Sequence, residues 1–426
     1  MTLGVLILPG SYSLSGWFIG SVIIIWLGFI SWLSASFLIE AQACANRLED
    51  YRKGILDADY SLTRDYNLSE LIMIMLGKTD QVMYTTIVIA ELYFEAFIVT
   101  IVVGRSVAHT ICSGGEVEYV SNDQTCSDGI PFQKINIYRI STLVFVLVGV
   151  VLSAFSSKKA TPLHLIISIY RSSMVLAIII SAAYKIGRNK TQTPVAMAGA
   201  HQLPKLLGST ILSFMCHHSI LRILYPVHKK NRLQSYIVKI FSSVICLYVI
   251  ISFTAILAFE PVQEVYSINF AVQSDDFVIK KVFDYLIAVY PAVAGLIVFI
   301  EISRSLQEHL QVLCLSFNDF ETYNFCIRKL YFPFFVILSV VVPLCTNKIK
   351  VFVPIAGTFG GNITQNIIPL LLVHTGRKTC QKTLQPSVNY YSSPLKKWYW
   401  PLAVFIWVAI SLFATTITLI PYLMKL

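Results

Sequence analysis

Residues 15–43 of this chain have the sequence SGWFIGSVIIIWLGFISWLSASFLIEAQA. This stretch is long and apolar, and Glu40 is its single charged residue. An apolar run of about 20 residues crosses the hydrocarbon core of a bilayer as an α-helix. Only helices and closed barrels satisfy their backbone hydrogen bonds in lipid, and this run lacks the two-residue alternation of a barrel strand. The stretch therefore predicts a transmembrane helix.

The composition of the whole chain leads to the same class. Of 426 residues, 56% are hydrophobic and 13% are charged, and the mean hydropathy is +0.68. Soluble domains carry about a quarter charged residues, so this chain lacks the polar side chains needed to cover a water-facing surface. We therefore expect one polytopic, all-α integral membrane domain over residues 1–426.

Further apolar runs predict ten complete spans. Residues 1–12 form an additional apolar fragment that is too short to cross the bilayer alone. The complete spans are expected at about 15–43, 82–111, 137–156, 163–185, 204–225, 236–259, 278–302, 326–346, 351–373 and 399–422.

The Lys and Arg residues behind the net charge of +10 lie between these spans. In such loops they set membrane topology more often than they bind nucleic acid, so no nucleic-acid partner is expected. One set of alternate loops, which includes residues 46–78 and 377–397, is richer in Lys and Arg. We expect that set on the cytoplasmic side and the loop at residues 113–134 on the opposite side.

The nine cysteines lack the spacing of a zinc site, so no metal is expected. Cys112 and Cys126 differ from the others because both belong to the polar loop that follows a span. If this loop faces an oxidising compartment, the two residues are expected to form a disulfide. Asn189, in an Asn-Lys-Thr sequon on the same side, is a candidate glycosylation site.

Two carboxyl groups, Glu91 and Glu95, lie deep within one predicted span. Their i,i+4 spacing places them on one helix face. Intramembrane ionisable residues are costly and mostly functional, so the pair could relay a proton, with Glu91 the better candidate. The alternative is a structural pair neutralised by a base such as Arg105 or Arg171.

Two apolar stretches contain residues that favour a helix break. One is residues 4–10, with Gly4 and Pro9, where the alternative is an ordinary helix end. The other is residues 209–226, with small polar residues and two adjacent histidines, His217 and His218, in mid-span. A histidine titrates near neutral pH, so either could carry a coupling proton. A helix break inside the bilayer frees N–H and C=O groups to hold a substrate.

One span, residues 351–373, has a face of small and polar residues that favours close helix packing. Its members are Gly357, Gly360, Gly361, Asn362, Gln365 and Pro369.

The chain contains no motif of a known catalytic class. A P-loop lysine motif, GxSxG and HExxH are all absent from the sequence. We therefore expect neither an ATP-driven pump nor an enzyme, and no cofactor.

Several segments together resemble the amino acid/auxin permease superfamily, most closely the branch of transmembrane protein 104. The resemblance covers nearly the whole chain, and the first and third segments are the most specific. The segments are LGVLILPGSYSLSGW, SFLIEAQACANRL, SFMCHHSILRILYPV, ISFTAILAF, YSINFA and GTFGGNITQNIIPLLL.

This resemblance implies an inverted-repeat (5+5 helix) amino acid transporter fold of about eleven helices. The first repeat would occupy about residues 1–185 and the second about residues 204–373, followed by an extra helix at about 399–422. Helices one and six are broken in that family, and substrate binds between the breaks. The implied substrate-binding residues are Gly4, Leu6, Ser213, Phe214, Cys216 and His217.

The implied function is secondary-active amino acid transport by alternating access, coupled to H⁺ or Na⁺. Glu91, His217 and His218 are the candidates for proton coupling. The protein is expected in a membrane as a multi-pass protein, with lysosomal or vacuolar and plasma membranes both open.

The start of the chain departs from the family pattern. Members have a further half-helix before the position of Gly4, and Thr2 and Leu3 replace a glycine and a threonine. We expect a truncated N-terminus. The alternative function is a non-transporting membrane scaffold or nutrient sensor that retains the transporter fold.

Overall fold

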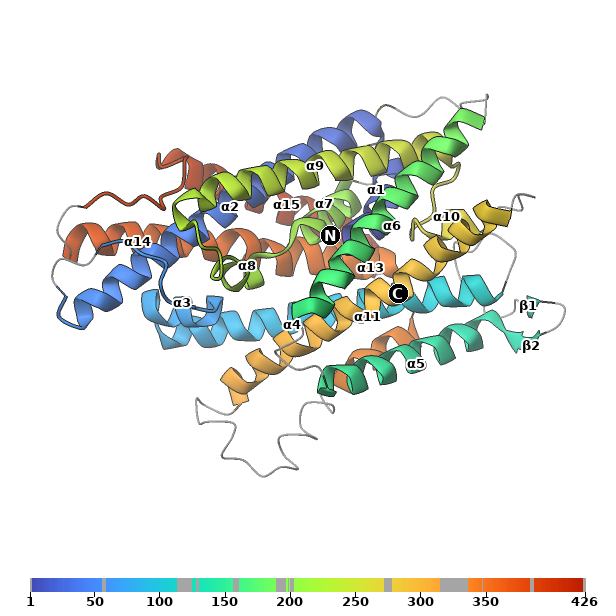
Figure 1. The fold of residues 1–426 in the computed structure, drawn as a ribbon, viewed down its shortest axis with the longest axis horizontal. Coiled ribbons are helices and arrows are strands. Elements are labelled where there is room, and N and C mark those ends of the chain that lie inside the picture. The colour runs from blue at the N-terminus through green and yellow to red at the C-terminus, as the bar shows by residue number, and fades with distance from the viewer. Residues whose placement is uncertain are drawn as a thin grey trace.

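The chain folds into an elongated bundle of helices (Figure 1). The computed structural model describes residues 2–55, 59–112, 125–127, 130–155, 161–188, 197, 199, 203–271, 278–314, 336–346, 348–383 and 387–423. Asn189, the candidate glycosylation site, lies outside these residues.

In its described residues, the first half of the chain contains six α-helices and one antiparallel hairpin. They are α1 (Thr2–Ser15), α2 (Trp17–Arg52), α3 (Leu68–Met75), α4 (Lys78–Ile111), β1 (Thr125–Ser127), β2 (Ile130–Gln133), α5 (Lys134–Phe155) and α6 (Thr161–Arg188).

In the second half, every regular element within the described residues is a helix. Its elements are α7 (Leu203–Phe214), α8 (His217–Leu224), η2 (Lys230–Arg232), α9 (Leu233–Ala258), α10 (Ile268–Ala271), α11 (Val278–Cys314), an unlabelled helix Val336–Cys345, α13 (Ile349–Pro354), η4 (Ile355–Gly361), η5 (Ile363–Ile367), α14 (Ile368–Thr383) and α15 (Tyr399–Leu423).

Within the described residues, seven helices are long and apolar enough to cross a membrane. The protein is therefore a helical, multi-pass membrane protein. Three of the ten predicted spans take another form. Residues 204–225 are divided into α7 and α8, residues 351–373 run through α13, η4, η5 and α14, and only part of residues 326–346 is described.

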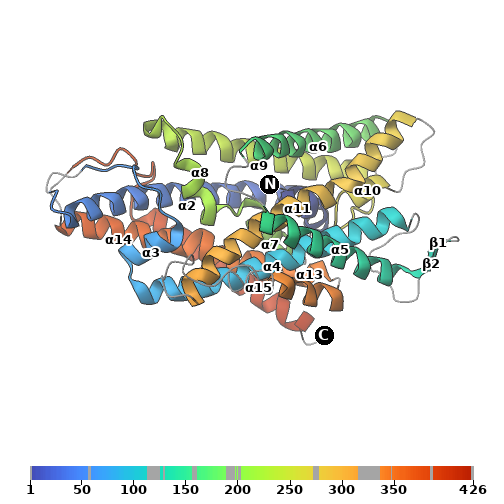
Figure 2. The same cartoon turned by 60° about the horizontal axis from the view of Figure 1, so that its bottom comes forward.

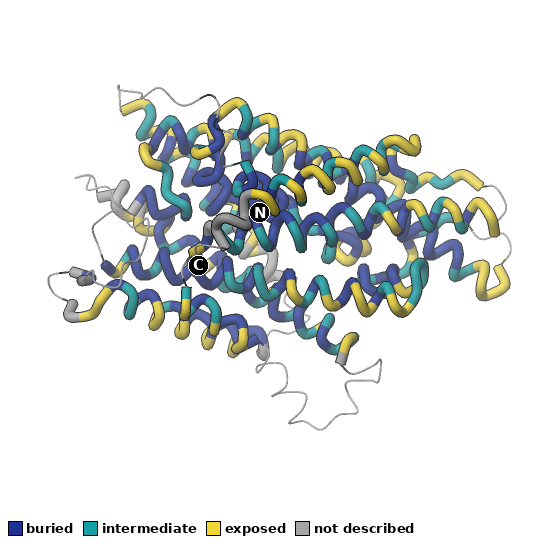
Figure 3. The backbone as a smooth tube through the Cα atoms, turned by 180° about the vertical axis from the view of Figure 1, so that it is seen from behind, coloured by how far each residue is buried: buried dark blue, intermediate teal, exposed yellow. Residues whose placement is uncertain are grey.

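The surface of the bundle matches a lipid environment. Large apolar side chains such as Leu147, Ile166 and Phe413 are exposed on the outer helices. Figure 3 shows the buried residues gathered in the middle of the bundle and the exposed ones on the outward faces of the helices. Bilayer hydrocarbon covers such apolar faces in a membrane protein, so their exposure does not require another protein partner.

The stretch at residues 4–10 is helical, so the expectation of a break within it is wrong. Pro9 lies inside α1, and the chain is interrupted instead at Gly16, where φ is 82°. A position with positive φ favours glycine, because the Cβ of another residue would clash with the backbone there. Membrane helices tolerate an internal proline when neighbouring groups satisfy the freed backbone.

The helix at residues 349–383 crosses α7 at very short range. A Cβ added to Gly357 would lie 1.9 Å from the backbone oxygen of Gly208. This confirms the prediction of close packing for Gly357. The local geometry differs from the ordinary helix expected there. η4 and η5 are π-helical turns, which are wider than α-helical turns.

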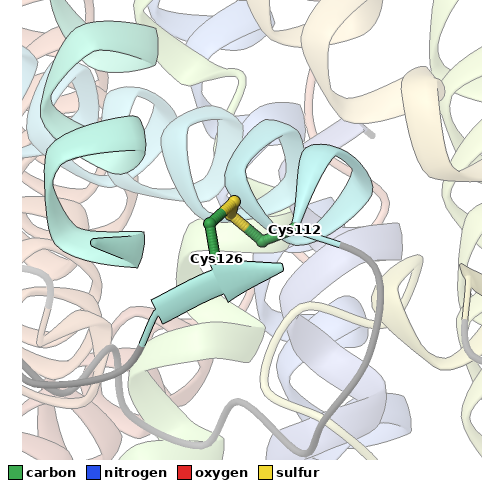
Figure 4. Close-up of a disulfide and its surroundings, with 2 residues drawn as sticks. All are labelled: Cys112 and Cys126. Atoms are coloured by element: carbon green, nitrogen blue, oxygen red, sulfur yellow. A yellow bond between two sulfur atoms is a disulfide. The ribbon is translucent and has the colours of Figure 1, made fainter. Parts of the chain in front are cut away.

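A disulfide joins Cys112, at the end of α4, to Cys126 in β1 (Figure 4). The hairpin continues directly into α5, so this bond links the ends of two neighbouring helices. In two views, β1 and β2 lie at one end of the long axis, and α14 lies with the C-terminal end of α2 at the other (Figures 1 and 2).

The crossing at Gly357 leads to the first prediction. Gly357→Ala should lower the free energy of unfolding by about 1–3 kcal/mol, because the new methyl group forces two helix backbones apart. Thermal unfolding of the purified protein in detergent measures the change. Gly187→Ala is the matched control, since a Cβ at this helical glycine meets nothing within 4 Å. Equal melting temperatures for the two variants would contradict the prediction.

Candidate functional site

An interruption between α7 and α8 forms the centre of the candidate site. α7 ends at Phe214 and α8 begins at His217, so Met215 and Cys216 are not helical. The residues around it are largely buried, with Ser213 6% and His217 0% exposed. The break predicted for residues 209–226 is confirmed. It leaves carbonyl groups of α7 and amide groups of α8 without partners in their own helices.

A tyrosine from a neighbouring helix satisfies one of these carbonyls. The hydroxyl of Tyr248, in α9, donates a hydrogen bond of 2.9 Å to the backbone oxygen of Ser213. The ring of Tyr248 also packs edge-on against Phe214, with 5.2 Å between centroids. Phe214 stacks on Phe241 at 6.5 Å. The break is therefore flanked by an aromatic wall from α9.

The first turn of α1 lies against the same point. A Cβ added to Gly4 would be 2.6 Å from the hydroxyl oxygen of Tyr248 and 2.7 Å from the Ser213 side chain. A glycine at this position lets the two helix ends meet. The first-turn amides of a helix lack intrahelical partners and carry a partial positive charge. These amides of α1 are thus close to the carbonyl end of α7.

Of the six residues expected to bind substrate, Gly4, Ser213 and Phe214 are brought together around Tyr248. Leu6 is buried, and its backbone oxygen accepts a hydrogen bond of 2.7 Å from the Tyr266 amide.

The two histidines of the break face different surroundings. His217 Nε2 lies 3.1 Å from the backbone oxygen of Ser31 in α2. A carbonyl only accepts, so Nε2 carries the hydrogen and Nδ1 is an acceptor, which has no partner in the described structure. His218 is half-buried and lies within electrostatic range of Arg222 and Glu308.

A buried polar cluster joins Ser31, the partner of His217, to the π-helical turns η4 and η5, here called the π-helical segment. The side-chain amide of Gln365 contacts the hydroxyl of Ser31, and the hydroxyl of Ser34 donates to the backbone oxygen of Gln365. All three residues are at most 1% exposed. The polar residues of residues 351–373 therefore do more than permit close packing, because they also bond α2.

In the acidic pair of α4, Glu91 lies against the π-helical turn η5. Thr364, in η5, donates a hydrogen bond of 3.0 Å to Glu91 Oε1, and both side chains are buried. A Cβ at Gly360 would come within 3.0 Å of the Glu91 side chain. Glu95 is also buried. The carboxyl group of Glu91 is thus seated against the π-helical segment.

The arginines proposed as neutralising bases pair with other carboxylates. Arg105 lies 2.7 Å from Glu264, and Arg171 lies 3.9 Å from Glu301. Glu264 also pairs with Lys205 at 3.3 Å. These contacts join the two arginines to acids other than Glu91 and Glu95, and the interpretation of Glu91 and Glu95 as a structural pair stays open.

The site residues that sequence reasoning missed are Tyr248, Ser31 and Thr364. Tyr248 is one aromatic residue in a long apolar helix, and Ser31 is one of several serines in α2. Neither has a local signal. Thr364 directly precedes Gln365, which belongs to the polar face at residues 351–373, so its position in the sequence did mark it as a candidate. An intramembrane hydroxyl near an intramembrane carboxyl is a natural hydrogen-bond partner.

No known family profile matches the sequence. The chain is 26% identical over 471 aligned residues to the transmembrane protein 104 homolog of Drosophila melanogaster, covering 95% of this chain and 91% of that protein. It is 23% identical to transmembrane protein 104 of Gallus gallus and 24% identical to that of Homo sapiens, each covering 95% of this chain and 90% of the relative. The chain is therefore similar over nearly its whole length to proteins named transmembrane protein 104.

Proposed function

We propose that this protein is a secondary-active amino acid transporter of the amino acid/auxin permease superfamily, working by alternating access with H⁺ or Na⁺. One observation carries the proposal: the buried break between α7 and α8 lies against the first turn of α1. Broken helix ends that meet within a membrane bundle offer backbone groups to a small polar solute. In the inverted-repeat arrangement that we propose, these two elements occupy equivalent places in the two repeats.

An amino acid suits the chemistry of this place. Its carboxylate would bind the first-turn amides of α1 near Gly4, which carry partial positive charge. Its ammonium group would bind carbonyl oxygens at the end of α7, near Ser213. Phe214 and Tyr248 would then contact the substrate side chain, with the break at Cys216 forming the floor.

A proton is the coupling ion that the buried acid favours. Glu91 accepts a hydrogen bond from Thr364, which belongs to the π-helical segment. Protonation would remove the charge that strengthens this bond and so loosen the segment from α4. His217 offers a second buried proton acceptor through Nδ1, and His218 a third group nearer to charged residues.

Removal of the tyrosine hydroxyl tests the binding site. Tyr248→Phe removes a hydrogen bond worth about 1 kcal/mol at the break, so KM for amino acid uptake should rise about fivefold with a smaller effect on the maximal rate. Uptake of radiolabelled amino acids into proteoliposomes, with the full chain, measures both. Tyr285→Phe is the control, because Tyr285 is 62% exposed on α11.

Several outcomes separate the alternatives. An unchanged KM in Tyr248→Phe would exclude the site proposed here, although not transport itself. Absence of uptake for every amino acid would contradict the transport proposal. Thermal stabilisation by one amino acid without any flux would instead support a nutrient sensor that retains this fold.

Neutralisation of the buried acid tests the coupling. Glu91→Gln keeps the shape of the side chain but cannot gain or lose a proton, so uptake should no longer respond to a pH gradient. Exchange of labelled for unlabelled substrate should remain. Glu301→Gln serves as control, since the side chain of Glu301 is 50% exposed. A pH response that survives in Glu91→Gln, or uptake that responds to Na⁺ alone, would contradict a coupling role for Glu91.

A further inference from the structure

Two free cysteines meet where α2 and α14 pack together, at the end of the molecule opposite β1 and β2 (Figures 1 and 2). Cys44 is 3% exposed and Cys380 is 4% exposed. The sulfur of Cys380 lies 3.9 Å from the backbone oxygen of Cys44, and a Cβ added to Gly376, one turn before Cys380, would lie 3.4 Å from the sulfur of Cys44. The disulfide at the other end is a separate bond between Cys112 and Cys126.

The helices hold these thiols in a fixed register. One turn before Cys44, the carboxylate of Glu40 forms two bonds of 2.8 Å with the guanidinium of Arg377. A Cβ added to Gly376 would lie 3.1 Å from the Cβ of Cys44, so the backbones approach closely. Cys380 follows Gly376 by one helical turn. A paired charge and a close backbone contact therefore hold the two cysteines within the same contact between α2 and α14 before any reaction.

The surroundings favour the thiolate of Cys380. The hydrogen bond from Cys44 lowers the pKa of the Cys380 thiol below its usual value, and Tyr60 and Arg47 lower it further against the opposing effect of burial. The guanidinium of Arg47 is stacked over the ring of Tyr60, at 4.5 Å from its centroid. A thiolate is the form of cysteine that acts as a nucleophile and reacts with peroxide.

We propose that Cys44 and Cys380 form a redox modification site, in which hydrogen peroxide converts the two thiols into a reversible disulfide between α2 and α14. Cys380 attacks one oxygen of the peroxide, the O–O bond breaks, and the departing hydroxide takes the thiol proton to form water. Cys44 then attacks the resulting sulfenic acid, the S–O bond breaks, and a second water leaves with the proton of Cys44. A dithiol reductant restores both thiols.

The position of the pair fits such a switch. The pair lies in α2 and α14 near the loops at residues 46–78 and 377–397, which are richer in Lys and Arg. We expect these loops on the cytoplasmic side. Disulfides on that side are transient, so the resting state has free thiols. The disulfide would fix α2, which carries Ser31, to α14, which directly follows η5 and its Gln365. This inference does not depend on the transport proposal.

Peptide mapping tests the inference on the full chain in detergent. Brief treatment with hydrogen peroxide, alkylation of the remaining thiols and mass spectrometry should detect a cross-linked peptide pair containing Cys44 and Cys380. Dithiothreitol should abolish it. Cys246→Ser is the matched control and should leave the cross-link unchanged, because Cys246 is an exposed free cysteine.

Single substitutions identify the attacking sulfur. In Cys44→Ser, peroxide should leave Cys380 as a sulfenic acid that dimedone labels, whereas in Cys380→Ser the remaining Cys44 should stay unlabelled. Oxidation of Cys380 without a cross-link in the unsubstituted protein would overturn the proposal. So would two unmodified thiols under conditions that fully oxidise Cys246. The cross-link in the unsubstituted protein decides the matter even if a variant fails to fold.

Discussion

Between α7 and α8 the helix is interrupted at Met215 and Cys216, inside the bundle. Lipid offers no hydrogen bonds to backbone groups, so an interrupted helix is stable in a membrane only where other protein groups surround it. The Tyr248 hydroxyl bonds the Ser213 carbonyl, Gly4 brings the first turn of α1 to the same place, and His217 bonds the backbone of Ser31. Residues of α9, α1 and α2 therefore all contact the residues beside this break.

The π-helical turns at residues 355–367 connect this break to the buried acid. Gly357 fixes them against α7, while Thr364 bonds Glu91 on α4 and Gln365 contacts Ser31 on α2. π-helical turns are rare and occur frequently at functional sites. Residues 355–367 therefore contact both Glu91 on α4 and Ser31 on α2, and Ser31 is the hydrogen-bond partner of His217. A change in the hydrogen bonding of Glu91 would act on this shared segment.

The sequence predicted the features that follow from local composition and missed those that depend on tertiary partners. Long apolar runs predicted most of the spans, and small polar residues with two adjacent histidines predicted a break within residues 209–226, which the structure places at Met215 and Cys216. The continuity of α1 through Pro9 could not be foreseen, because it depends on neighbouring helices. The partner of Arg105 is Glu264, 159 positions along the chain, and no local pattern joins them. Tyr248 likewise gains its role only from where α9 packs.

Ion pairs of unequal strength lie toward the two ends of the bundle. At the disulfide end, Glu264 binds both Arg105 and Lys205, and all three side chains are at most 12% exposed. Breaking a buried pair costs about 3–5 kcal/mol, because it leaves a buried charge unpaired. At the other end, α8 and α11 are joined by Arg222 and Glu308, whose side chains are about half exposed. An exposed pair contributes about 0–1 kcal/mol, so separation of α8 from α11 meets little ionic resistance. At the same end, α2 and α14 are held more firmly, because the pair of Glu40 and Arg377 is largely buried.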